Sequence, residues 1–112
     1  KLVRVIEGSV LDIAVDIRKS SPTFGNHIAA KLTGENKHQL FVPHGFAHGF
    51  VVLSNTATFA YKVDNYYSPE YDRGIAFDDD ELNIDWILPI EKIQLSLKDK
   101  SQPKLSNSTD LL

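Results

Sequence analysis

The chain has 112 residues and a net charge of −3, with 42% apolar and 24% charged residues. This size predicts one soluble globular domain, and the slight acidity offers no basic surface for nucleic acid or an anionic membrane. The sequence has no cysteine, which excludes disulfides, thiolate metal sites and a cysteine nucleophile. No signal peptide is visible and no apolar run approaches the ~20 residues that span a bilayer, so we expect a cytoplasmic protein.

The beginning of the chain is unusual. It starts at Lys1, directly in strand-like sequence, and contains no methionine. These features predict that the natural beginning of the protein lies upstream, and that this is an N-terminally truncated form.

Short apolar runs separated by turn residues predict strands along most of the chain. Gly8, between the first two runs, can take the positive φ of a tight hairpin. In the second run, alternation places Val10, Asp12, Ala14 and Asp16 on one face and the apolar side chains on the other. We expect strands at residues 2–6, 10–18, 27–32, 39–42, 46–53, 57–63, 75–77 and 93–97, and one helical turn at 78–82.

This pattern predicts an all-β sandwich or barrel. No internal repeat or linker divides the chain. We expect a single domain over 1–112, with its core at about 1–99 and a polar tail at 100–112.

The sharpest local motif is the run Pro43-His44-Gly45-Phe46-Ala47-His48-Gly49-Phe50. A Pro-x-Gly-x-x-His run in a β-rich chain resembles the second motif of the cupin superfamily, whose metal-binding members use the histidine as one ligand. Their other ligands come from an earlier His-x-His with a downstream glutamate, which this chain lacks. Because zinc and iron sites generally need three or more protein ligands, we predict no metal.

Five polar residues have a structural interpretation, and three of them also have a functional one on the residues alone. His48 is either a buried, hydrogen-bonded histidine or a site residue, and Asp12 either faces it across the barrel or lies on the solvent side of an edge strand. Tyr61 is either core packing or a general acid. Asp99 and Lys1 are, on the residues alone, a solvated charge at a strand end and a frayed terminal lysine.

Longer segments carry a more specific resemblance. The stretches KLVRV, DIAVDIRKSSPTFG, ENKHQLFVPHGFAHGF, YKVDNYYSPEYD and IDW occur in one order over nearly the whole chain up to about Asp99. They resemble the dTDP-4-dehydrorhamnose 3,5-epimerase family. The resemblance implies a cupin-type jelly-roll barrel and a homodimer. It also implies epimerisation of dTDP-4-dehydro-6-deoxy-D-glucose at C3 and C5 in dTDP-L-rhamnose biosynthesis, without a cofactor.

The resemblance also assigns roles. In the family a histidine removes the proton next to the C4 ketone, a cation stabilises the enolate and a tyrosine protonates the opposite face. By position, Tyr61 is the proton donor, Lys1 the cation near the enolate, and Asp99 the carboxylate that orients the basic histidine.

Four further positions are implied to contact the substrate. His48 and Asp12 match a polar pair that lines the site, Tyr67 matches an aromatic near the nucleotide, and Lys98 approaches the ligand.

One departure from the family bears on activity. The family's basic histidine lies in an Arg-Gly-Leu-His-x-Gln type segment before the lysine matched by Lys1, and this segment is absent here. General base catalysis is typically worth about 10²–10⁴ in rate. We therefore expect residues 1–112 alone to be weakly active or inactive.

Other functions stay open at this point. They are a metal-dependent cupin, a non-catalytic sugar-nucleotide binding or dimerisation module, and a related mono-epimerase or ketoisomerase. The presence of Tyr61 favours the double epimerase.

Overall fold

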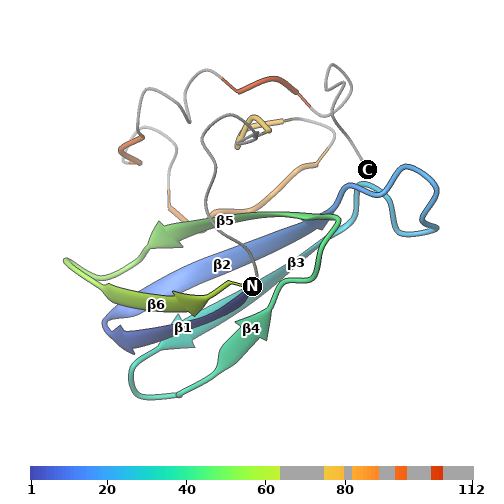
Figure 1. Cartoon of the computed structure of the whole chain (residues 1–112). Coiled ribbons are helices and arrows are strands. Elements are labelled where there is room, and N and C mark those ends of the chain that lie inside the picture. The colour runs from blue at the N-terminus through green and yellow to red at the C-terminus, as the bar shows by residue number, and fades with distance from the viewer. Residues whose placement is uncertain (64–74, 80–81, 89–92, 96–101, 105–112) are drawn as a thin grey trace.

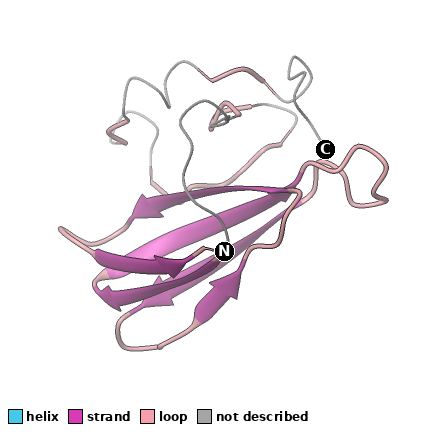
Figure 2. Ribbon diagram, viewed as in Figure 1, coloured by secondary structure: helices cyan, strands magenta, loops and turns pink. Residues whose placement is uncertain are grey.

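The strands that the structure describes lie between Leu2 and Lys62. The computed structural model describes residues 1–63, 75–79, 82–88, 93–95 and 102–104 (Figures 1 and 2). Within these residues the strands agree with the first six predicted ones to within two residues at each end. They are β1 (Leu2–Glu7), β2 (Ser9–Asp16), β3 (His27–Thr33), β4 (Gln39–Phe41), β5 (Phe46–Val52) and β6 (Thr58–Lys62).

The strands form two antiparallel sheets, with the orders β4-β1-β6 and β3-β2-β5. They lie as two layers, with β1 and β6 on one side of β2 and β5 (Figure 1). Four of the five connections between these strands cross from one layer to the other, whereas β2 and β3 pair within one sheet. Repeated crossing between two layers is typical of a jelly roll. The prediction of an all-β jelly-roll fold is confirmed. In the described part of the chain, no helix has the length and apolarity needed to cross a membrane.

The predicted hairpin at Gly8 is wrong in one respect. Gly8 does take a positive φ, of 89°. However, β1 and β2 enter different sheets, so the turn carries the chain from one layer to the other. A Cβ at Gly8 would lie 2.4 Å from the Thr56 carbonyl oxygen, in the connection between β5 and β6. The close approach of these two connections therefore requires a glycine.

An apolar core fills the space between the sheets. Val3 and Val5 of β1 contact Val10 of β2 and Leu32 of β3, and all four are buried. Phe59 of β6 packs against the same cluster. Burial of a side chain of this size typically contributes about 1.5–3 kcal/mol. The inward face of β2 that carries Val10 also carries Asp12, Ala14 and Asp16.

A second apolar cluster covers the other face of the β3-β2-β5 sheet. Leu11, Ile13 and Val15 of β2 contact Leu82, and Trp86 is among the residues that pack around them. In Figure 1 this C-terminal part of the chain lies on the side of β5 away from β1. Both faces of β2 are therefore covered.

Two predicted strands are not confirmed. Residues 75–77 form no strand, and neither do residues 93–95; residues 96–97 lie outside the described part. Instead, the amide of Ala76 donates to the carbonyl of Pro103 at 2.7 Å, and that of Asp79 to the carbonyl of Ala76 at 3.3 Å. Ile75 is covered by packing on the outer face of the sheet, so its burial needs no strand ladder. In the predicted helical turn, residues 80 and 81 lie outside the described residues.

Candidate functional site

A buried carboxylate and an imidazole meet on the inner face of the β3-β2-β5 sheet. Asp12 of β2 is opposite Phe50 and Ala14 is opposite His48 of β5, which makes Asp12 and His48 diagonal neighbours. His48 Nε2 lies 2.5 Å from Asp12 Oδ1, and the side chains are 10% and 0% exposed. Asp12 thus faces His48, and its alternative position on the solvent side of an edge strand is wrong, because β2 is the central strand of its sheet.

The second oxygen of Asp12 differs from the first. Asp12 Oδ2 is buried and has no hydrogen-bond partner among the described residues. A buried carboxylate without full hydrogen bonding is costly, so the contact with His48 stabilises it. In return, the carboxylate fixes the orientation of the imidazole ring.

The opposite sheet contributes a phenol and an ammonium group. Tyr61 of β6 is opposite Val3 of β1, so its side chain lies on the inner face. Lys1 Nζ lies 5.1 Å from the centre of the Tyr61 ring, within the range of a cation–π interaction. Lys1 is not frayed, because its carbonyl accepts the amide of Val42 at 2.7 Å. Tyr61 is 59% exposed, so core packing is not its role.

Aromatic rings connect these two polar pairs. The ring of Phe59 lies 6.3 Å from His48 and 6.1 Å from Tyr61, measured between centroids. Phe50 stacks on Phe59 with centroids 4.6 Å apart. Phe59 therefore brings His48 of one sheet and Tyr61 of the other to a common surface inside the fold. The sequence indicates Phe59 only as a neighbour of Tyr61 on one face, and it gives no sign of the contact with Phe50.

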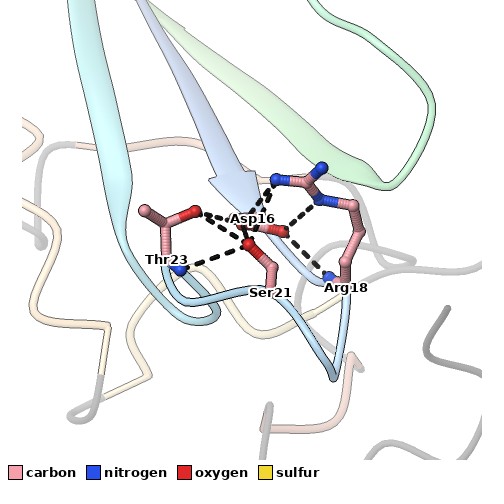
Figure 3. Close-up of polar contacts among 4 residues, drawn as sticks. All are labelled: Asp16, Arg18, Ser21 and Thr23. Atoms are coloured by element: carbon pink, nitrogen blue, oxygen red, sulfur yellow. Dashed lines mark hydrogen bonds and ion pairs between the residues drawn. The ribbon is translucent and has the colours of Figure 1, made fainter.

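A polar cluster ends β2 on the same face as Asp12 (Figure 3). The Asp16 carboxylate accepts hydrogen bonds at 3.0 Å from Arg18 Nε and Nη2, one to each oxygen. The hydroxyls of Ser21 and Thr23 also donate to it. The Arg18 guanidinium holds the pKa of Asp16 well below its usual range, and the hydroxyls lower it further. This cluster orders residues 17–25 and was not singled out by sequence reasoning, because Asp16 follows the ordinary alternation of polar side chains.

Four of the seven predicted site residues lie in the described part of the chain. The structure brings Asp12 to His48 and Lys1 to Tyr61. The positions of Tyr67, Lys98 and Asp99 lie outside the described residues. Within the described residues, no group of three or more histidine, aspartate or glutamate side chains is placed to hold a metal ion.

Comparison with known proteins identifies the family. A family model described as dTDP-4-dehydrorhamnose 3,5-epimerase matches residues 1–107. The chain belongs to this epimerase family. It is 54% identical over 99 residues to the dTDP-4-dehydrorhamnose 3,5-epimerase of Shigella flexneri, an alignment that covers 88% of this chain and 54% of the relative.

Solved structures of the epimerase family share the fold. A dTDP-6-deoxy-D-glucose-3,5-epimerase of Legionella pneumophila, in complex with dTDP-4-keto-L-rhamnose, superposes with a TM-score of 0.91 at 52% identity. That match covers 95% of this chain and 56% of the other. A 3'-monoepimerase of Streptomyces bikiniensis, in complex with dTDP-quinovose, gives a TM-score of 0.86 at 27% identity, with 94% and 52% covered. The chain thus spans about half the length of these epimerases.

Proposed function

We propose that the protein carrying these residues epimerises a dTDP-4-keto-6-deoxy sugar at C3 and C5, through proton removal and return next to the C4 ketone. The ketone acidifies the hydrogens on both neighbouring carbons, so the reaction needs a base, an acid on the opposite face and a positive group near the developing enolate oxygen. Membership of the epimerase family and the ligands of the related structures support this substrate class.

The observation that carries the proposal is the approach of Lys1 to Tyr61. The ammonium lies 5.1 Å from the phenol ring, on an inner face whose tyrosine is 59% exposed. A cation at this position stabilises the enolate, and the phenol delivers a proton to carbon. Both groups are accessible to a ligand, whereas a tyrosine in the packed core would not be.

His48 and Asp12 complete the polar lining in this proposal. The 2.5 Å contact holds the imidazole of His48 in one orientation, beside Phe59 and within the same inner surface. A fixed imidazole can hydrogen-bond to the sugar or to its ketone oxygen without an entropic cost at each turnover. Tyr67 and Lys98 are proposed to contact the nucleotide sugar, and Asp99 to orient the basic histidine.

Deuterium exchange tests the reaction directly. dTDP-4-keto-6-deoxy-D-glucose is incubated with the protein in D₂O, and deuterium at C3 and C5 is measured by proton NMR and mass spectrometry. The proposal expects deuterium and inversion at both carbons. Tyr61→Phe should slow the inversion, and Lys62→Ala, a substitution on the outer face of the same strand, should not. Binding of the nucleotide sugar without exchange at either carbon would instead support a non-catalytic binding module.

A mono-epimerase is the second candidate. The similarity to the 3'-monoepimerase of Streptomyces bikiniensis favours it, because the same fold carries that activity. The two candidates differ in the position of the label, since a mono-epimerase exchanges one carbon and leaves the other unlabelled. Epimerisation at one carbon also needs an acid on the opposite face, so Tyr61 fits both candidates, and the double epimerase is supported by the similarity to the dTDP-4-dehydrorhamnose 3,5-epimerases.

The proposal includes a homodimer. The outer face of the β4-β1-β6 sheet carries the exposed apolar side chains of Leu2, Ile6 and Phe41. Leu2 and Phe41 are register partners, so they form one patch. Apolar patches of this kind commonly mark protein interfaces. Light scattering should give the mass of two chains, and Phe41→Glu should give the mass of one.

The cytoplasmic location expected from the sequence stays a prediction.

A further inference from the structure

Trp86 lies directly behind the strand that carries His48. A Cβ built on Gly49 of β5 would be 3.4 Å from Cη2 of the Trp86 ring, so the ring rests against the strand backbone. His48 and Gly49 are successive residues, and their side-chain positions point to opposite faces of the sheet. The tryptophan therefore supports β5 from the outer face at the point where His48 projects inward.

The two partners of the carboxylate–imidazole pair are held differently. Asp12 lies on β2, which pairs with β3 on one side and β5 on the other and is covered on both faces. β5, within the described residues, pairs with β2 alone. His48 thus has a less constrained backbone than Asp12, because a strand with one neighbour has fewer hydrogen bonds to fix its position and orientation in the sheet.

Packing on the outer face supplies the missing constraint. Glycine in a strand leaves a gap on the face where a side chain would lie, and it commonly marks the close approach of another group. At Gly49 that group is the Trp86 ring. Loss of the ring would leave the backbone next to His48 without contact on that side, and β5 would be free to move outward and lengthen the 2.5 Å contact between His48 and Asp12.

Trp86 is itself fixed by its surroundings. Its indole Nε1 donates to the Phe77 carbonyl at 2.9 Å, and its own carbonyl accepts the amide of Leu88 at 2.8 Å. Two nearby residues, Asn83 and Ile87, have positive φ values of 49° and 72°. Such backbone conformations persist only where the surrounding contacts determine them, and they are common beside functional sites.

We propose that Trp86 is a positioning residue for the reaction. Its ring fixes how far β5 lies toward the inner face of the sheet, and thereby sets the contact between His48 and Asp12. This inference rests on the proposed function for its effect on rate. The effect on the His48–Asp12 pair, however, is a property of the protein without ligand. A displacement of ~1 Å at reacting groups can lower a rate about 10²-fold, so the geometry of His48 matters well beyond the stability of the fold.

The test uses three variants of the chain. Trp86→Leu removes the ring, and Trp86→Phe keeps a ring but not the hydrogen bond to Phe77. Val51→Ala is the matched control, because Val51 lies on the same strand and packs in the same outer cluster but is not the residue that Trp86 covers at Gly49. Urea midpoints measured for all three separate loss of stability from loss of position.

The first measurement is the ¹⁵N NMR spectrum of the histidine rings without ligand. Trp86→Leu should shift the His48 ring resonances and weaken the signal of the proton shared with Asp12, Trp86→Phe should restore most of this signal, and Val51→Ala should leave it unchanged. The second measurement is deuterium exchange, where Trp86→Leu should lower kcat by about ten- to a hundredfold while KM changes little.

The outcomes are distinct. If Trp86→Leu leaves the His48 resonances where they are, or moves them no more than Val51→Ala does, Trp86 is only a packing residue and the inference is overturned. If the resonances shift but neither the whole protein that carries these residues nor any of its variants exchanges deuterium, Trp86 positions His48 and it is the proposed function that fails.

Discussion

His48 Nε2 lies 2.5 Å from Asp12 Oδ1, although the residues are 36 positions apart in the sequence. The contact joins β5 to β2, the central strand of its sheet, and buries a carboxylate completely. Removing one partner of a buried hydrogen-bonded pair leaves the other unsatisfied, whereas removing both often costs much less.

The first prediction concerns the stability of this pair. His48→Ala should lower the free energy of unfolding by about 3–5 kcal/mol, because the Asp12 carboxylate then stays buried without a partner. The double variant Asp12→Ala with His48→Ala should cost less than the sum of the two single changes. Urea denaturation of the four proteins of this cycle measures the coupling, and strictly additive losses would mean that the two groups do not interact.

The second prediction concerns proton transfer. Tyr61→Phe should lower the rate of inversion at C3 and C5 by about 10²–10⁴, because the variant keeps the ring and loses only the acidic hydroxyl that protonates the opposite face. Its stability should remain close to that of the parent, since the side chain is 59% exposed. Lys62→Ala, on the outer face of the same strand, is the control. Unchanged inversion in Tyr61→Phe would show that another group delivers the proton.

The third prediction concerns pH. The pKa of Asp16 is lowered in the folded protein, chiefly by its hydrogen bonds to Arg18, from an ordinary value of 3.8. The unfolded chain therefore binds this proton more readily, and stability falls as the pH drops below about 4. Asp16→Asn should reduce this loss between about pH 4 and pH 2, as measured by urea midpoints. The exposed Glu35→Gln serves as the control for the loss of one carboxylate, and an equal reduction there would contradict the assignment.

The fourth prediction concerns backbone strain. Ile87 has a φ of 72°, which typically costs a β-branched residue about 1–3 kcal/mol, and its side chain is exposed. Ile87→Gly should therefore raise the free energy of unfolding by about 1 kcal/mol, once the added freedom of glycine in the unfolded chain is subtracted. Asn83→Gly should change stability less, because asparagine tolerates this conformation. Thermal denaturation compares the variants, and destabilisation by Ile87→Gly would show that its side chain contributes packing.

The sequence predicts the strands well where each run shows its own alternation. The six strands up to Lys62 follow from short apolar runs and turn residues. The failure at Gly8 is physical, because a glycine at positive φ serves equally in a hairpin and in a connection between two layers. Residues 75–77 were mistaken for a strand because burial of Ile75 comes from packing on the sheet rather than from pairing.

The candidate site was predictable in its residue types more than in its geometry. Asp12 in a mostly apolar strand and His48 after a proline-glycine turn made a buried pair one of two interpretations, and the structure places Asp12 against His48. The stacking of Phe50 on Phe59 and the approach of Trp86 to Gly49 depend on how layers meet in space. No local pattern encodes those contacts.

The connection at Gly8 also determines which end of the two layers tolerates substitution. The amide of Ser9 donates to Ser54 Oγ at 3.0 Å, and the amide of Leu53 donates to the Ser9 carbonyl at 2.9 Å. The β1–β2 and β5–β6 connections are therefore joined by hydrogen bonds. Lys1 and Tyr61 lie at the other ends of β1 and β6. Substitutions near Lys1 and Tyr61 should therefore change the shape of that far end, while the hydrogen-bonded end keeps the spacing of the layers constant.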